Sequence, residues 1–222
     1  MLQKNNRVLM LVENLSVPAD PRVWREACTL RQYGYQVSII CPKGESRDWE
    51  SYVCIDGIHI YRYSLSTAIH RTSDYIKEYA TAMLKTLGLS IKVWHKHGFD
   101  VIHAANPPDT FFIIGLLYRI FGKKYIFDQH DLAPEILHVR FHNRMKPLYS
   151  LLKFLERCSY QAANLVITTN ESQKRTAITR GRCRPDKVVV VRNGPDIDKF
   201  ASVAPELALK QGKRYMLAYI GV

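Results

Sequence analysis

The sequence predicts an α/β fold: a Rossmann-like, mainly parallel sheet with helices on both faces. Short continuous apolar runs, such as VLMLV at 8–12 and VVVV at 188–191, are typical of strands buried on both faces. Segments with apolar residues at helical spacing separate most of these runs. Strands that alternate with helices form parallel sheets, and ligands bind beyond the carboxyl ends of such strands.

Capping and turn residues set the boundaries of the elements expected in the first half. Asp20 is a good helix N-cap, and Pro21 suits the first helical position. Gly34 ends that helix, and Asp56-Gly57 between two apolar runs predicts a hairpin. The elements expected here are a strand at 8–12, a helix at 21–34, a strand at 37–41, a hairpin at 52–63, a helix at 73–98 and a strand at 101–104.

The second half continues the alternation of strands and helices. The elements expected here are a helix at 106–121, a strand at 125–127, a basic helix at about 146–163, a strand at 165–168, a helix at 171–180 and a strand at 188–191. After a turn at Asn193-Gly194, residues 215–220 are expected to begin one more strand.

The charge balance predicts an anionic partner. The chain has 222 residues, of which 47% are apolar, and its formal net charge is +12. This composition excludes a disordered chain, a collagen and a disulfide-stapled mini-protein. The excess of basic residues fits an anionic membrane surface, a phosphorylated substrate or nucleic acid. Nucleic acid has less support, because the sequence contains no recognition motif or aromatic platform.

Cysteine usage and hydropathy predict a cytoplasmic protein. Any association with a membrane is expected to be peripheral, at the inner face of the plasma membrane. The five cysteines contain no C-x-x-C pair, which fits reduced thiols. The apolar run at 8–12 is too short for a signal peptide. The longest apolar stretch, 111–118, is too short to span a bilayer.

Several common sites of α/β proteins are absent from the sequence. No G-x-G-x-x-G follows the first strand, and no P-loop, H-E-x-x-H or G-x-S-x-G elbow occurs, which weighs against a dinucleotide dehydrogenase and against several hydrolase classes. Asp196 and Asp198 spell D-x-D, but the sequence identifies no further oxygen ligands. We therefore expect no metal site.

Polar clusters follow four of the expected strands instead. These clusters are HAANP at 103–107, DQHD at 128–131, TTNE at 168–171 and RNG at 192–194. Together with their flanks they resemble the N-terminal domain of family-4 glycosyltransferases, which have the GT-B fold of two Rossmann-like domains. The matching stretches are RVWREACTLRQYGYQVSIICP, FDVIHAANPPD, YIFDQHDLAPE, ANLVITTNES and VVVVRNGPDIDKF, and they cover most of residues 7–200. The loop at 16–22 departs from the family, because SVPADPR stands where many members have a Gly-Gly loop.

The resemblance implies a retaining transfer of a sugar from a nucleotide-sugar donor to a glycan or a lipid-linked acceptor, without a cofactor or a required metal. Residues 1–200 would form the acceptor domain. Residues 201–222 would form a linker and the first strand of a C-terminal donor domain that is largely missing here. The chain as given is therefore expected to be inactive alone. The alternative is a non-catalytic α/β binding module, either a truncated product or a split subunit.

The resemblance also assigns roles to residues at the strand ends. His130 matches the family histidine beside the reacting sugar, and Asp131 is placed with it as catalytic. The alternatives are a loop histidine satisfied by Asp128 or Asp131, and helix capping by Asp131. The residues expected to bind the acceptor are Asp128, Glu135, His103, Asn106, Asp20 and Arg22. Asp128, Asp131 and Glu135 could instead orient His130. Those expected at the interdomain cleft are Thr169, Asn170, Glu171, Asn193 and Gly194.

Some of these residues also have purely structural interpretations. Asp20 is first a helix cap, Asn106 before Pro107 suits a turn, and His103 suits a satisfied strand end. Arg22 near a helix N-terminus fits a phosphate or a carboxylate. Basic residues with interleaved apolar ones at 138–160 predict contact with an anionic membrane or with phosphate, or else a core helix with a solvated basic face. The basic residues singled out are Arg140, Arg144, Lys146, Lys153 and Arg157.

Overall fold

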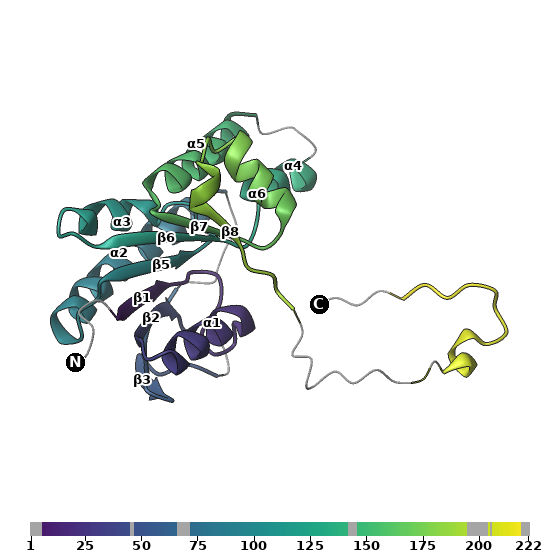
Figure 1. The fold of residues 1–222 in the computed structure, drawn as a ribbon, viewed down its shortest axis with the longest axis horizontal. Coiled ribbons are helices and arrows are strands. Elements are labelled where there is room, and N and C mark those ends of the chain that lie inside the picture. Colours follow the sequence, from purple (N-terminus) through teal and green to yellow (C-terminus); the bar gives the residue numbers. More distant parts are fainter. Residues whose placement is uncertain are drawn as a thin grey trace. The chain divides into compact units, whose positions relative to one another are not determined.

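The computed structural model describes residues 6–44, 47–65, 72–141, 146–194, 204 and 206–218, with no account of the side chains at 72–76, 140, 141 and 207. The chain divides into two compact units, residues 1–192 and 193–222 (Figure 1). The first unit contains every strand of the described sheet. In the second unit the described residues contain one short 3-10 helix, η3 (Leu207–Lys210). The predicted domain boundary at residue 200 stays a prediction, because residues 195–200 lie outside the described ranges.

The first unit is built on an eight-stranded sheet, which confirms the predicted fold class. The strand order is β3-β4-β2-β1-β5-β6-β7-β8. All neighbours are parallel except β3 and β4, which form the predicted hairpin at one edge. The strands are β1 (Arg7–Leu11), β2 (Gln36–Pro42), β3 (Tyr52–Ile55), β4 (Ile58–Tyr63), β5 (Val101–Ala105), β6 (Lys124–Gln129), β7 (Leu165–Thr168) and β8 (Val188–Val190).

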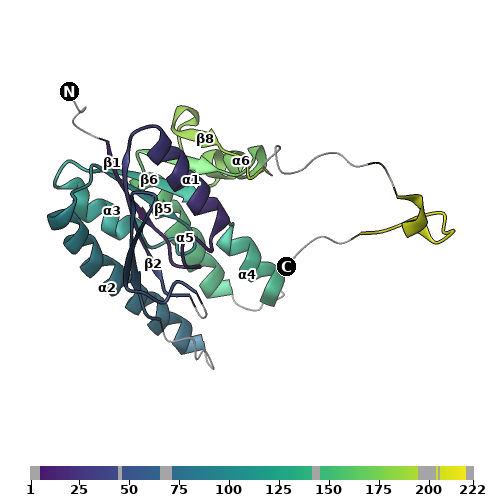
Figure 2. The same cartoon turned by 90° about the horizontal axis from the view of Figure 1, so that it is seen from below.

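Helices cover both faces of the sheet. The helices are α1 (Pro21–Gln32), α2 (Thr72–Lys96), α3 (Phe112–Arg119), α4 (Ala133–Phe141), α5 (Lys146–Ala162) and α6 (Glu171–Thr179), with a 3-10 turn η1 (Pro185–Lys187). Strands β1 and β2 run between α1 on one side and α2 with α3 on the other (Figure 2). Buried residues of α2, α3, α5 and α6 share one core cluster, whereas α1 contributes to the other.

The central strand β1 explains why VLMLV is apolar throughout. Leu9 and Leu11 belong to the core under α2 and α3, and Val8 and Met10 belong to the core under α1. Successive side chains of a strand point to opposite faces, so a strand that is covered on both faces needs an unbroken apolar run.

The start of one predicted helix and one predicted strand differ from the structure. The helix expected from 106 begins only at Phe112, because Pro107 and Pro108 disfavour helical backbone in the residues before them. The strand expected at 215–220 is not seen in its described part, since residues 215–218 have no regular structure. A strand needs a neighbour to take its backbone hydrogen bonds, and these residues pair with none of the described strands.

Within the part of the chain that the structure describes, no helix combines the length and the apolar character that crossing a membrane requires.

Candidate functional site

Four of the predicted residues meet at the carboxyl edge of the sheet. His103 lies on β5, Asp128 on β6, His130 just after β6, and Arg22 in the first turn of α1. The parallel register places Ala105 beside Asp128, so the ends of β5 and β6 are adjacent. The sheet order, which inserts β1 between β2 and β5, brings α1 over the same edge.

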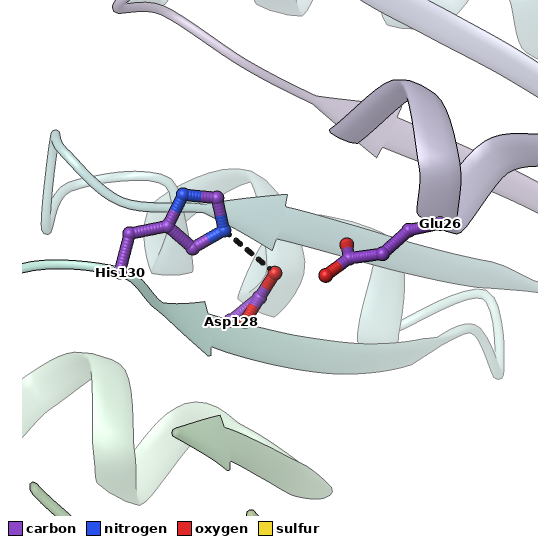
Figure 3. A group of neighbouring side chains, drawn as sticks. All are labelled: Glu26, Asp128 and His130. Carbon is purple, nitrogen blue, oxygen red and sulfur yellow. Dashed lines mark hydrogen bonds and ion pairs between the residues drawn. The ribbon is translucent and has the colours of Figure 1, made fainter. Parts of the chain in front are cut away.

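Asp128 is the centre of this cluster and is completely buried. Its Oδ1 accepts a hydrogen bond from Arg22 Nη2 at 2.7 Å. Its Oδ2 lies 2.8 Å from His130 Nε2 and 3.3 Å from His103 Nε2 (Figure 3 shows the His130 contact). Burial alone would raise the pKa of Asp128, but the hydrogen bonds from His103 and His130 outweigh burial and hold the pKa well below its usual range. Asp128 is therefore a carboxylate at neutral pH.

The charge on Asp128 fixes the tautomers of both histidines. An ionised carboxylate only accepts hydrogen bonds, so His103 and His130 each donate through Nε2–H. The two rings differ in exposure, because the side chain of His103 is 7% exposed and that of His130 is 18% exposed. Burial lowers the pKa of His103, but its hydrogen bond to Asp128 and the charges of Asp128 and Glu26 together outweigh burial, so the pKa is raised. His130 is therefore the more exposed of the two histidines.

Glu26 joins the cluster and was not predicted from the sequence. It lies one turn after Arg22 on α1, with its Oε1 3.0 Å from Arg22 Nε. Its Oε2 lies 3.6 Å from His103 Nε2. Burial, followed by the charge of Asp128, raises the pKa of Glu26. The i,i+4 spacing of Arg22 and Glu26 is the sequence signal that could have found this residue.

Two carboxylates and one histidine of the cluster also lie close enough together to bind a metal ion. Glu26, Asp128 and His130 each offer one ligand atom, and these atoms lie within 4.8 Å of one another (Figure 3). However, the Arg22 guanidinium already contacts both carboxylates and supplies the compensating positive charge. We therefore interpret the cluster as a charge-compensated one. Asp196 and Asp198, of the D-x-D sequence, lie outside the described residues.

Asp20 and Asn106 support the site from within the protein. Asp20 Oδ1 accepts hydrogen bonds from the backbone N–H groups of Arg22 and Val23, each at 3.0 Å. Asp20 is therefore the N-cap of α1, as its alternative interpretation predicted. Asn106 is 2% exposed, and its amide is bonded to the backbone of residues 130 and 131. Both side chains are largely buried and bonded within the protein, and contact with an acceptor stays a prediction for them.

Glu135 and Asp131 are placed differently from His130. Glu135 pairs with Arg180, the residue directly after α6, and Arg180 also bonds to the buried Glu156. Its carboxylate is therefore engaged in a second ionic cluster rather than with the His130 ring. Asp131 is exposed, and its backbone N–H and C=O are both bonded to Asn106.

The expected cleft residues after β7 form the start of α6. Asn170 Oδ1 caps the helix by accepting from Gln173 N at 2.9 Å. Thr169 bonds to Gln173 Oε1 through both its backbone N–H and its hydroxyl, and Glu171 is exposed in the first turn. Asn193 and Gly194 are exposed at the start of the second unit. A role at a cleft stays a prediction for these five residues.

Comparison with known proteins identifies the family. The sequence profile of Glycosyltransferase Family 4 matches residues 22–199, which is most of the chain. The chain belongs to glycosyltransferase family 4. It is 28% identical over 186 residues to a chitobiosyldiphosphodolichol beta-mannosyltransferase of Candida albicans, which covers 80% of this chain and 40% of that protein. It is also 28% identical to the protein of that name from Debaryomyces hansenii, over 79% of this chain and 38% of the relative.

Solved glycosyltransferases share the fold of this family-4 chain. A sucrose-phosphate synthase from Thermosynechococcus elongatus superposes with a TM-score of 0.64 at 12% identity, over 93% of this chain and 53% of the other. A UDP-glucosyltransferase from Polygonum tinctorium gives a TM-score of 0.56 at 12% identity, over 96% of this chain and 57% of the other. This likeness confirms the predicted half of a GT-B fold. The chain spans about 40% of the length of the curated relatives.

Proposed function

We propose that the chain is the acceptor-binding half of a glycosyltransferase that transfers a sugar from a nucleotide-sugar to a glycan or a lipid-linked acceptor. The observation that carries this proposal is the pair of His130 and the buried carboxylate Asp128 at the carboxyl edge of the sheet. Family membership supports the reaction class. Both curated relatives are named as mannosyltransferases of chitobiosyldiphosphodolichol, a lipid-linked sugar, which supports an acceptor of that kind.

The geometry suits His130 to proton chemistry at an acceptor hydroxyl. In a retaining transfer, the acceptor oxygen bonds to the anomeric carbon on the face that the nucleoside diphosphate leaves, while the bond to that group breaks and the hydroxyl loses its proton. His130 Nε2–H is used by Asp128, so Nδ1 carries the lone pair that can accept a hydrogen bond or that proton. A buried carboxylate behind an imidazole orients the ring and stabilises its protonated form. Of the two roles expected for Asp128, we accordingly assign it the orientation of His130.

Arg22 has a donor that the cluster leaves unused. Its Nη1 is buried and has no hydrogen-bond partner among the described residues. A guanidinium at the start of a helix suits a phosphate or sugar oxygen. Because Nη1 is buried in the free chain, we propose that substrate binding exposes it and pairs it with an anionic or hydroxyl-bearing group of the substrate.

A histidine substitution tests the catalytic assignment. In a longer chain that carries a donor domain, His130→Ala should lower kcat by about a hundredfold or more, the usual size of a general acid–base contribution. His95→Ala is the matched control, because His95 is exposed near the end of α2. The measurement is transfer of labelled sugar from a nucleotide-sugar, and the 222-residue chain assayed alone should show none.

Two results would contradict this assignment. Wild-type turnover in the His130→Ala variant would remove His130 from the reaction. No turnover in the longer wild-type chain, across nucleotide-sugar donors, would favour the non-catalytic binding module instead.

We also propose that the transfer retains the configuration of the anomeric carbon. The names of both relatives specify a beta-linked product, so the donor configuration decides between retention and inversion. NMR of the donor and of the product measures this directly. The same anomeric configuration in both supports retention, and opposite configurations overturn it.

We also propose that the surface formed by α4 and α5 binds an anionic membrane. Its exposed apolar residues are Ile136, Val139, Leu151 and Phe154, which are 50–75% exposed. Lys146 and Arg157 are exposed on α5, and Lys153 lies over the Tyr149 ring. The side chain of Arg140 and all of Arg144 lie outside the described residues. Apolar side chains with basic neighbours are typical of helices at a membrane surface. A peripheral location at the cytoplasmic face follows from this proposal.

A further inference from the structure

Two amide side chains hold the backbone of His130 on both sides of its Cα, one at its N–H and one at its C=O. Asn106 Oδ1 accepts the N–H of His130 at 2.6 Å. Gln173 Nε2 donates to the C=O of His130 at 3.1 Å. Asn106 directly follows β5 and Gln173 lies on α6, so two separate elements fix the residue that carries the ring.

Asn106 uses its full hydrogen-bonding capacity in this contact. Besides His130, its Oδ1 accepts the N–H of Asp131 at 3.1 Å. Its Nδ2 donates to the C=O of Asp131 and to Asp109 Oδ1, each at 2.8 Å. An amide offers two acceptor lone pairs and two N–H groups, and all four are used here. The contact with Asp109 also fixes the orientation of the Asn106 amide, because a flipped amide would place its Oδ1 against Asp109 Oδ1.

Gln173 is oriented in the same manner by Thr169. Its Oε1 accepts from the backbone N–H of Thr169 at 3.0 Å and from the Thr169 hydroxyl at 2.7 Å. With its oxygen fixed there, the amide can only present Nε2–H to His130. Gln173 is 9% exposed, so water competes weakly for these bonds.

We infer that Asn106 and Gln173 are positioning residues that hold the His130 ring against Asp128. The inference rests on the role of His130 in the proposed function and adds two residues that never touch the substrate. His130 lies in the loop between β6 and α4, where the backbone has no regular hydrogen bonds of a helix or a strand to hold it. A ring on a loosened loop would sample other rotamers and lose its bond to Asp128. Catalytic geometry tolerates errors of only about 0.5 Å, so such loosening matters.

The tautomer of His130 reports this positioning without any enzymatic assay. The ring bonds to Asp128 only as the Nε2–H form, and a histidine released to solvent populates both neutral tautomers. Long-range ¹H–¹⁵N correlation spectra of the 222-residue chain, at a pH where the ring is neutral, distinguish the two forms. Gln173→Glu is the sharpest variant, because it keeps the oxygen that Thr169 needs and replaces the donor to His130 with a carboxylate oxygen that the C=O of His130 repels.

Two controls match the two substitutions. Gln161→Glu removes an amide donor to the C=O of Gly181, and Asn164→Ala removes an asparagine oxygen that accepts from Tyr125 N at the start of β6. Within the described residues, neither side chain is hydrogen-bonded to the loop at 128–131, so neither substitution should alter His130. We expect the Nε2–H form alone in the wild type and in both controls. We expect both tautomers in Gln173→Glu and in Asn106→Ala.

A single Nε2–H tautomer retained in Gln173→Glu, with the fold intact, would overturn the inference. Since Asn106→Ala removes a buried network, Gln173→Glu keeps the test decisive if the former does not fold. The two proposals also fail separately. Loss of turnover in His130→Ala with an unchanged tautomer in Gln173→Glu would reject the positioning role alone. The reverse pattern would reject the catalytic role of His130 and leave the positioning of its ring established.

Discussion

Every buried charge around Asp128 is offset by an opposite charge from a different element. Arg22 of α1 contacts Asp128 of β6, and His103 of β5 contacts the same carboxylate. A buried ion pair gives little net stability, but removing one partner leaves an uncompensated charge. The arrangement is therefore better explained by the site it forms than by a contribution to folding.

Asp109 is a buried acid whose protonation depends on pH in the neutral range. Burial, partly opposed by the hydrogen bond from Asn106, raises the pKa of Asp109 from 3.8 to about 7. Its Oδ2 has no hydrogen-bond partner among the described residues. The ionisable groups that face it are Glu156, Arg180, Tyr125 and Tyr160.

Asp109→Asn should flatten the pH dependence of stability. The folded-state pKa lies above the unfolded value, so the protonated acid favours the fold. Its contribution is complete below pH 3.8 and is lost as pH rises through about 7. Asparagine keeps an oxygen for Asn106 and cannot ionise. We therefore expect the free energy of unfolding of the variant, relative to that of the wild type, to increase as the pH rises from 5 to 8. Urea titrations at several pH values measure this. A difference between the two proteins that stays constant with pH would contradict the prediction. Glu13, whose pKa is also raised to about 7, is common to both proteins and cancels.

The elements of the site are positioned by caps and by close packing rather than by helix propensity. Asp20 starts α1 so that Arg22, in its first turn, reaches Asp128. Arg62 of β4 holds the preceding loop through a 2.7 Å bond to the C=O of Val17. The loop at 16–22, which departs from the family pattern in sequence, thus has its own anchors.

Two helical glycines should respond oppositely to alanine. A Cβ at Gly115 of α3 would lie 2.6 Å from Tyr125 Cγ and 2.7 Å from Cδ2, near the stem of a buried ring. Gly115→Ala should therefore destabilise the fold by about 1–3 kcal/mol. A Cβ at Gly88 of α2 meets nothing within 4 Å, and Gly88→Ala should stabilise by about 0.5–1 kcal/mol through helix propensity. Free energies of unfolding from urea titration measure both. The same sign for both variants would show that packing of α3 on β6 does not decide the difference.

At the scale of the whole molecule, the net charge of +12 governs which surfaces the chain approaches. Anionic vesicles should bind the chain, neutral vesicles should bind it less, and added salt should weaken the binding. Phe154→Ser on α5 should lower the binding several-fold, because Phe154 is 62% exposed beside the basic residues. Leu84→Ser is the matched control on α2, where Leu84 is 70% exposed. Vesicle sedimentation measures both. Equal binding to neutral vesicles, or equal losses in the two variants, would exclude the α4–α5 surface.

The sequence by itself determined the fold class, the family and the strand ends that carry the site. Apolar runs such as VLMLV report burial on both faces, and that information is local. The expected strand at 215–220 shows the limit of local information. Its described residues have strand-forming side chains but no strand partner, and pairing is a property of two segments.

Only the tertiary structure decided which residues share the site and what each one does. Glu26 and Gln173 are ordinary helix positions in the sequence, and only the order of the strands turns them toward Asp128 and His130. Asp20 caps α1, Asn106 supports the loop after β6, and Glu135 pairs with Arg180. Contact with an acceptor stays a prediction for all three. The physical reason is that a side chain's role depends on the partners that burial leaves it, and those come from segments far away in the chain.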